Sequence, residues 1–291
     1  MTSTPRTRPR TVALRRPSAW AAGLLGLLAL VVLTMAVRAA AAGSPADVAK
    51  AEEGKPTVVL VHGAWADSSS WAKVVRRLQQ GGYTVEVPAN PLRGLTSDSA
   101  YLASYLDTIS GPVVLVGHSY GGAVITNAAT GDSDVKALVY IDAFVPDEGE
   151  TVVRLATAEP GSAIGGDPAT VFDAVPIPGS TGDVDLYVKK TVFPDAFAND
   201  LPRKTAAVLA AVQRPVAFSA LVTPSGAPAW ETIPSWYFVG TLDRVLPPAA
   251  QRFMAERADA VTVEVRASHL PMVSRPSAVT RLILDAAESV Q

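Results

Sequence analysis

Residues 113–130 constrain the fold of this chain more than any other stretch. Four apolar residues of high β propensity lead directly into Gly-His-Ser-Tyr-Gly-Gly, and a run of small residues that favours a helix follows. A strand, a sharp turn and a helix in this order are the context in which a G-x-S-x-G motif presents its serine. Gly117 and Gly121 lack the side chains that would collide in such a turn. The segment predicts that Ser119 lies exposed at the turn, beside a helix N-terminus that favours negative charge.

Strand and helix patterns alternate on both sides of this segment. Continuous apolar runs predict strands at 57–61, 84–87, 113–116, 135–141, 236–239 and 261–265, with helical patterns at 71–80, 97–110, 123–130, 247–257 and 276–290. This alternation predicts an α/β fold with a mostly parallel central sheet and helices on both faces. Residues 143–233 do not show this alternation of strand and helix patterns, and they have helical patterns only near 184–191 and 202–212. Because this stretch is too long for a plain loop, we expect a cap over the strand ends.

Composition excludes several kinds of chemistry. The chain has no cysteine, which rules out disulfides, thiolate metal sites and a cysteine nucleophile. His62, His118 and His269 are its three histidines, and none belongs to a cluster at metal-ligand spacing, so no metal is expected. Residues 1–46 hold six arginines and no acid, which leaves 19 basic and 27 acidic residues in the remainder. Residues 47–291 therefore carry a net negative charge and have no extended run of basic residues, which argues against nucleic-acid binding.

The N-terminus has the pattern of an export signal. An arginine-rich start precedes an uninterrupted apolar run at 19–37, and small residues follow at 39–43. These are the three parts of a cleavable signal peptide, so we expect residues 1–43 to direct export and residues 44–56 to be a polar linker. The apolar run is close to the minimum length of a membrane span, so an uncleaved anchor facing outside the cytoplasm is the alternative. Residues 57–291 then form one domain.

Ser119 needs a general base, because an alcohol is a poor nucleophile at neutral pH. His118 is its neighbour in the turn, where its side chain points elsewhere, and His62 belongs to the loop after the first strand. His269 follows the last strand, where its ring can reach back over the sheet edge. By elimination, His269 is the predicted base.

Two acids compete to orient this histidine. The acid is expected between the nucleophile and the histidine in the chain, at the C-terminal end of a strand. Asp243 follows the strand at 236–239 through a polar turn, and Asp142 ends the strand at 135–141. We favour Asp243 because its turn lies one strand before His269. Asp142 is then a residue of the pocket wall or a support for a loop.

Attack of Ser119 on a carbonyl carbon would place negative charge on the carbonyl oxygen, and this oxyanion needs two hydrogen-bond donors. The backbone N–H of Tyr120, directly after Ser119, is one candidate. The N–H of Ala64 is the other, with Gly63 permitting the close approach and His62 holding the loop in a structural role. Trp65 either lines the pocket or packs under the cap, and the sequence does not decide between the two.

From residue 57 to the C-terminus, the chain resembles the α/β-hydrolase superfamily. The resemblance rests on HGAW at 62–65, GHSYGG at 117–122, GTLD at 240–243 and SH at 268–269. DAFVP at 142–146 and WYFVG at 236–240 resemble segments of small bacterial serine esterases related to plant methyl-ester esterases and hydroxynitrile lyases. The resemblance implies a cofactor-free hydrolase with Ser119, His269 and Asp243 as its triad, and a mainly helical cap at about 143–233.

The expected activity is that of a serine carboxylesterase. The lyases of this group carry a threonine near the histidine of the first loop and a lysine after the catalytic histidine, whereas this chain has Gly63 and Leu270. The aromatic residues of 143–233 and the scarcity of clustered charges there favour a small, uncharged ester as substrate. The alternatives are lactone or amide hydrolysis, perhydrolysis or C–C lysis on the same fold, and a ligand-binding protein without turnover.

Overall fold

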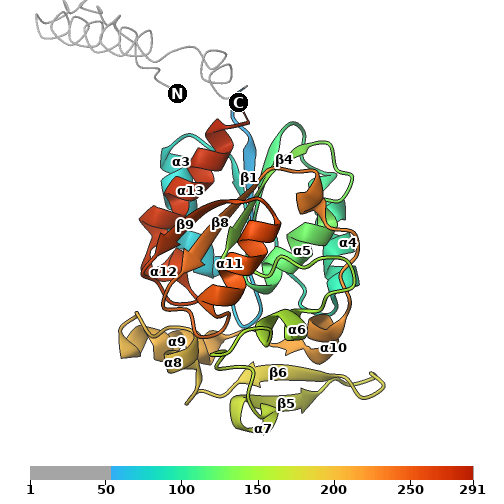
Figure 1. Ribbon diagram of the computed structural model, residues 1–291, viewed down its shortest axis with the longest axis vertical. Coiled ribbons are helices and arrows are strands. Elements are labelled where there is room, and N and C mark those ends of the chain that lie inside the picture. Colours follow the sequence, from blue (N-terminus) through green and yellow to red (C-terminus); the bar gives the residue numbers. More distant parts are fainter. Residues whose placement is uncertain (1–53, 291) are drawn as a thin grey trace, which may run out of the picture. The chain divides into compact units, whose positions relative to one another are not determined.

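A six-stranded parallel sheet forms the centre of the protein in the computed structural model, which describes residues 54–290 (Figure 1). The strand order is β2-β1-β3-β4-β8-β9, and every neighbouring pair runs parallel. The strands are β1 (Thr57–Val61), β2 (Val85–Glu86), β3 (Val113–His118), β4 (Val135–Ile141), β8 (Ser235–Gly240) and β9 (Val261–Val265). The predicted fold class, an α/β protein with a mostly parallel sheet, is confirmed.

Helices cover both faces of this sheet, which explains why its central strands are continuous apolar runs. Every residue of β3 and of β8 is buried. In Figure 1, α3 and α13 lie together on one side of the sheet, whereas α4 and α5 lie on the other. The helices of the body are η1 (Ser68–Trp71), α3 (Ala72–Gln80), α4 (Leu95–Leu106), α5 (Tyr120–Ala128), α11 (Pro248–Arg257), α12 (Pro271–Ser274) and α13 (Pro276–Glu288).

The cap is the chain between β4 and β8, and most of its elements, from α6 to α10, lie at the bottom of the view in Figure 1. It contains short helices and also a three-stranded antiparallel sheet of order β5-β6-β7, which the expectation of a mainly helical cap did not include. Its elements are α6 (Val152–Ala156), α7 (Pro168–Val171), β5 (Phe172–Pro176), β6 (Val184–Val188), α8 (Phe193–Ala196), α9 (Arg203–Val212), β7 (Val216–Ala217), α10 (Phe218–Val222) and η2 (Ala229–Glu231).

The helix predicted near 184–191 is wrong, whereas the one predicted at 202–212 is present as α9. Residues 184–188 form β6, in which Leu186 and Val188 are buried and the residues between and before them are half-buried. This alternation has the period of two of a strand with one covered face. The apolar residues 184, 186 and 188 follow the same period in the sequence, and β-branched valines occupy both ends.

The turn at Ser119 explains its glycines. Strand β3 ends at His118, helix α5 begins at Tyr120, and Ser119 between them has a positive φ of 52°. A Cβ atom on Gly117 would lie 2.6 Å from the carbonyl oxygen of Gly121, and one on Gly121 would lie 2.6 Å from that of Val61. Both clashes are with backbone atoms, so neither position accepts a side chain without movement of the sheet or the helix.

The export signal, the alternative membrane anchor and most of the 44–56 linker lie outside the described residues and stay predictions. Within residues 54–290, no helix combines the length and apolar character that crossing a membrane requires. The described residues from Gly54 onward belong to one compact unit, in which the cap is inserted between β4 and β8.

We expect Gly121→Ala to lower the free energy of unfolding by about 1–3 kcal/mol, because the new methyl group meets the carbonyl oxygens of Val61, at the end of β1, and of His62. Urea denaturation followed by circular dichroism measures this loss. Gly166→Ala is the matched control, since no heavy atom lies within 4 Å of its added Cβ atom. Equal unfolding midpoints for the two variants would contradict the steric explanation.

Candidate active site

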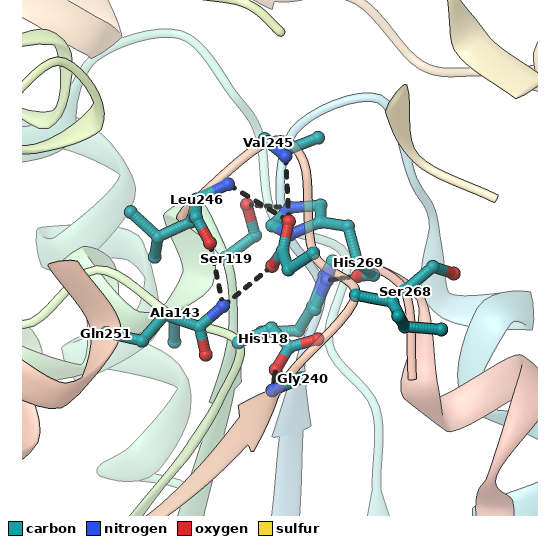
Figure 2. Close-up of polar contacts among 12 residues, drawn as sticks. His118, Ser119, Ala143, Gly240, Val245, Leu246, Gln251, Ser268 and His269 are labelled. Atoms are coloured by element: carbon teal, nitrogen blue, oxygen red, sulfur yellow. Dashed lines mark hydrogen bonds and ion pairs between the residues drawn. The ribbon is translucent and has the colours of Figure 1, made fainter. Parts of the chain in front are cut away.

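Three side chains from separate loops form one continuous hydrogen-bonded chain. The imidazole Nε2 of His269 lies 2.8 Å from Ser119 Oγ, and its Nδ1 lies 2.7 Å from Asp243 Oδ2. Ser119 follows β3, Asp243 follows β8 and His269 follows β9, so all three come from the carboxyl ends of parallel strands. Figure 2 shows Ser119 and His269 facing each other, with Val245, Leu246 and Gln251 close by. The structure thus brings together the three residues that the sequence proposed as nucleophile, base and acid.

Ser119 is 1% exposed, so the prediction that it lies exposed at its turn is wrong. Ser119 and residues of the cap line the same cavity, so the turn lies under the cap. His269 is fully buried as well. The sequence pattern of the turn carries no information about the cap, whose residues come from a distant part of the chain.

Four donors hold the carboxylate of Asp243. Its Oδ1 accepts from the backbone N–H groups of Val245 and Leu246, at 2.8 and 3.0 Å. Its Oδ2 accepts from the Gln251 side chain at 2.9 Å and from the His269 ring. A carboxylate with this many donors is stabilised in its charged form despite burial. Asp243 is therefore suited to hold the Nδ1–H tautomer of His269 and to stabilise its protonated ring.

Asp142, the competing acid, lies in a different environment. Its Oδ1 accepts one hydrogen bond, from the backbone N–H of Gly240 at 2.6 Å, and its Oδ2 has no hydrogen-bond partner among the described residues. Burial raises the pKa of Asp142 well above its usual range, and the nearby Asp243 carboxylate raises it further. The raised pKa favours the neutral form of Asp142, and its bond to Gly240 supports the end of β8, one of the two roles the sequence left to it.

Asp142, Asp243 and His269 also form the kind of cluster that can hold a metal ion, with one ligand atom from each within 4.8 Å of the others. Both ring nitrogens of His269 already have protein partners, Ser119 and Asp243. Asp243 has four donors of its own. His269 and Asp243 are therefore close because they are bonded to each other, whereas Asp142 is bonded to Gly240 instead.

His118 and His62 hold the backbone of the site. The Nε2 of His118 lies 2.7 Å from the carbonyl oxygen of His269 and therefore carries the hydrogen of this bond. Burial, followed by the nearby His269, lowers the pKa of His118 well below its usual value, which keeps its ring neutral. His62 donates from Nδ1 to the carbonyl of Gly63 at 2.9 Å, and its Nε2 accepts from the backbone N–H of Asn90 at 3.1 Å. Burial also lowers the pKa of His62.

The loop after β1 lies directly against Ser119. A Cβ atom on Gly63 would lie 2.6 Å from the Cβ of Ser119, so only glycine permits this approach. Ala64 and Tyr120 both line the cavity that Ser119 faces. Tyr120 is the first residue of α5, and the N–H of a first helical residue has no partner within its helix. Its side chain is anchored by a 2.8 Å hydrogen bond from its hydroxyl to Asp98.

The cavity at Ser119 has a volume of about 400 Å³, and its walls come from both the body and the cap. None of the described residues that line it has a charged side chain. Trp65 fulfils both roles that the sequence left open, because it lines this cavity and packs under the cap. Its indole ring stacks on Phe172 at 5.5 Å, and its Nε1 donates to the carbonyl of Leu186 at 2.8 Å.

Several supporting residues could not be found in the sequence. Gln251 holds Asp243, Asp98 holds Tyr120, and Asn90 holds the loop of His62. Asn199 and Asp200 contact the loops of Asp243 and His269 from the cap. Apart from the Gln251 contact, each of these contacts joins segments that are distant in the chain and depends on how the loops pack, so it has no local sequence signal. Gln251 lies only eight residues after Asp243.

A sheet of this order, with a serine turn after its central strand and the three side chains in hydrogen-bonding contact, is the arrangement of α/β hydrolases. The model of the alpha/beta hydrolase family matches residues 58–282. The chain belongs to this family, as its resemblance to the superfamily implied.

The relatives of the chain include named esterases. A carbendazim hydrolyzing esterase from Nocardioides sp. (strain SG-4G) is 34% identical over 110 residues, which are 33% of this chain and 46% of that protein. A pyrethroid hydrolase from Sphingobium wenxiniae is 28% identical over 80% of this chain and 88% of its own. Methylesterase 17 from Arabidopsis thaliana is 26% identical over 81% of this chain and 92% of its own.

Solved structures share the fold. A polyneuridine aldehyde esterase superposes with a TM-score of 0.68 at 20% identity, covering 79% of this chain and 98% of that one. A pyrethroid hydrolase from Sphingobium faniae JZ-2 superposes with a TM-score of 0.65 at 24% identity, covering 80% and 98%. These likenesses agree with the α/β-hydrolase fold of residues 54–290.

The two acids should respond differently to the loss of charge. We expect Asp243→Asn to lower kcat by about 10³–10⁴-fold, because the amide favours the wrong tautomer of His269. Asp142→Asn should keep kcat within about threefold of wild type, since an amide resembles the neutral acid and still accepts from Gly240. Steady-state kinetics on an aryl ester measures both. A large loss in Asp142→Asn alone would assign the acid role to Asp142.

Proposed function

We propose that the protein is a serine carboxylesterase. The observation that carries the proposal is the unbroken hydrogen-bonded chain from Ser119 through His269 to Asp243. Ser119 Oγ attacks the ester carbonyl while His269 Nε2 takes its proton, and Asp243 stabilises the imidazolium that forms. The tetrahedral intermediate then collapses, and His269 gives the proton to the departing alcohol. Water attacks the acyl-enzyme with His269 again as the base, which releases the carboxylic acid and restores Ser119.

The backbone N–H groups of Ala64 and Tyr120 stabilise the oxyanion in this proposal. Both residues line the cavity at Ser119, and the N–H of Tyr120 lies at the N-terminus of α5. Two fixed donors and the positive end of a helix stabilise negative charge that develops on the carbonyl oxygen. The close contact of Gly63 with Ser119 keeps the Ala64 loop near the reacting carbonyl.

The cavity favours a neutral ester with an apolar acyl or alcohol group. Its lining contains no charged side chain in the described residues, and the polar end of Trp65 is already bonded to Leu186. A charged group in such a cavity would lose its hydration without gaining a partner. The names of the relatives, which include hydrolases of carbendazim and of pyrethroids as well as methylesterases, support ester hydrolysis of small organic molecules.

The alternatives find less support. Leu270 stands after His269 where the lyases of the group carry a lysine, so no cation is available there to assist cleavage of a cyanohydrin. The relatives named by activity are esterases and hydrolases, in contrast to a ligand-binding protein without turnover. With the signal pattern of residues 1–43, we propose that this esterase acts outside the cytoplasm.

Replacement of the nucleophile tests the mechanism. We expect Ser119→Ala to lower kcat on p-nitrophenyl butyrate by at least about 10⁴-fold, because no acyl-enzyme can form. Wild-type protein should form a one-to-one adduct with a fluorophosphonate at Ser119, detected by mass spectrometry of the intact protein and its peptides. Ser104→Ala, which changes an exposed serine of α4, is the control for the substitution itself. Wild-type turnover in Ser119→Ala would refute the mechanism.

Charge on the substrate tests the proposed specificity. A neutral ester is compared with two isosteres that carry a carboxylate at the far end of the acyl group or of the alcohol group. We expect kcat/KM to fall by about 100-fold for the isostere whose charged half enters the cavity, since an unpaired buried charge costs several kcal/mol. Equal kcat/KM values for all three esters would mean that the apolar cavity does not bind the substrate.

A further inference from the structure

Three residues within a four-residue stretch of the cap contact the catalytic histidine and the loops of Asp243 and His269. We call residues 197–200 the cap segment. The ring of Phe197 packs edge-on against the imidazole of His269, with centroids 5.3 Å apart and planes at 79°. Asn199 and Asp200 extend from the same segment to the loops of Asp243 and His269. This segment follows α8 and lies far from both loops in the sequence.

Asp200 holds the residue directly before His269. The hydroxyl of Ser268 donates to Asp200 Oδ1, and Ser268 is fully buried. The carboxylate of Asp200 is only 4% exposed, and Arg275 Nη2 lies 3.8 Å from its second oxygen. A hydrogen bond to a buried carboxylate is stronger than one between neutral groups. It therefore restricts the backbone from which the His269 side chain extends.

Asn199 holds the residue directly before Asp243. Its Nδ2 donates to the carbonyl oxygen of Leu242 at 3.0 Å. From the opposite side, His118 Nε2 donates to the carbonyl of His269 at 2.7 Å. The base is thus held between a residue of the body and a segment of the cap, and the acid loop is bonded to that same segment.

We propose that the cap segment positions His269 and Asp243 for catalysis, with the Asp200–Ser268 hydrogen bond as its central contact. The inference rests on the proposed esterase function. Asp200 is a positioning residue, because it does not line the cavity at Ser119 and contacts none of the three reacting side chains. The base follows β9 and the acid follows β8. Because the cap segment is bonded to both of their loops, it fixes the position of one loop relative to the other.

The geometry of the site leaves little tolerance for movement of these loops. The two hydrogen bonds of the His269 ring are 2.8 and 2.7 Å long, and each weakens steeply when its geometry changes. Displacement of a catalytic group by about 1 Å can cost about 100-fold in rate. Loss of the Asp200 contact should therefore act on the chemical step rather than on substrate binding.

The central test is Asp200→Ala, measured on a neutral aryl ester. We expect kcat to fall by about 10- to 100-fold with KM within about twofold of wild type, because the cavity keeps its lining. Asp195→Ala is the matched control: its carboxylate is 59% exposed, forms only an ion pair with Arg203, and belongs to the same part of the cap. This control should keep the kcat of wild type.

Three further measurements separate positioning from a purely structural role. Ser268→Ala should lower kcat as much as Asp200→Ala, and the double variant should be no slower than either, because both changes remove one contact. Asp200→Asn should recover most of the lost rate, since its amide oxygen still accepts from Ser268.

The fluorophosphonate should label Asp200→Ala to one adduct per chain but at a lower rate. A purely structural role would instead lower the unfolding midpoint and the fraction labelled, with kcat per labelled site unchanged, and that result would overturn the proposal.

The outcomes also distinguish this inference from the proposed function. If wild-type protein labels at Ser119 and Ser119→Ala is inactive, but Asp200→Ala retains wild-type kcat, the esterase mechanism stands and the positioning role is wrong. If Ser119→Ala retains activity, the esterase mechanism itself fails. The labelling of wild-type protein is therefore measured first.

Discussion

The backbone conformation of Ser119 is the constraint on which the rest of the site depends. Its φ of 52° lies in the left-handed region, which a serine adopts only when its surroundings impose it, at a cost of about 1–3 kcal/mol. The imposing contacts are specific: the Ser119 carbonyl accepts from the N–H groups of Gly122 and Phe144, at 2.9 and 3.1 Å. They require β4 to lie directly beside β3, so that the chain after β4 reaches the turn. The order of the parallel sheet thus fixes the direction in which the hydroxyl points.

The two buried acids of the site differ in the number of donors they receive, and this difference separates their roles. Asp243 accepts four hydrogen bonds, whereas Asp142 accepts one and leaves an oxygen without a partner among the described residues. Two carboxylates this close cannot both be ionised at low cost in a buried site. Burial raises the pKa of Asp142, and the nearby Asp243 carboxylate raises it further. Chain position alone made both residues candidates, and only their surroundings distinguish them.

The sequence was sufficient for the features that depend on local pattern. Apolar runs and their spacing predicted the six strands of the central sheet, and the turn at Ser119 followed from its glycines. It failed where packing between distant segments decides. The sequence predicts a helix where β6 forms, and the burial of Ser119 depends on a cap that its own turn does not encode. Gln251, Asn199 and Asp200 are ordinary polar residues until the loops that they bond are brought to them.

The cap contributes to the site in two ways. Its residues form much of the apolar wall of the cavity at Ser119, and a less polar surrounding strengthens the electrostatic interactions of the site. Through Phe197, Asn199 and Asp200 it also contacts the base and the loops of base and acid. The cap segment does not line the cavity, so different parts of the cap form the cavity wall and hold the base. A change in the cap segment can therefore weaken the geometry of His269 while the cavity keeps its lining.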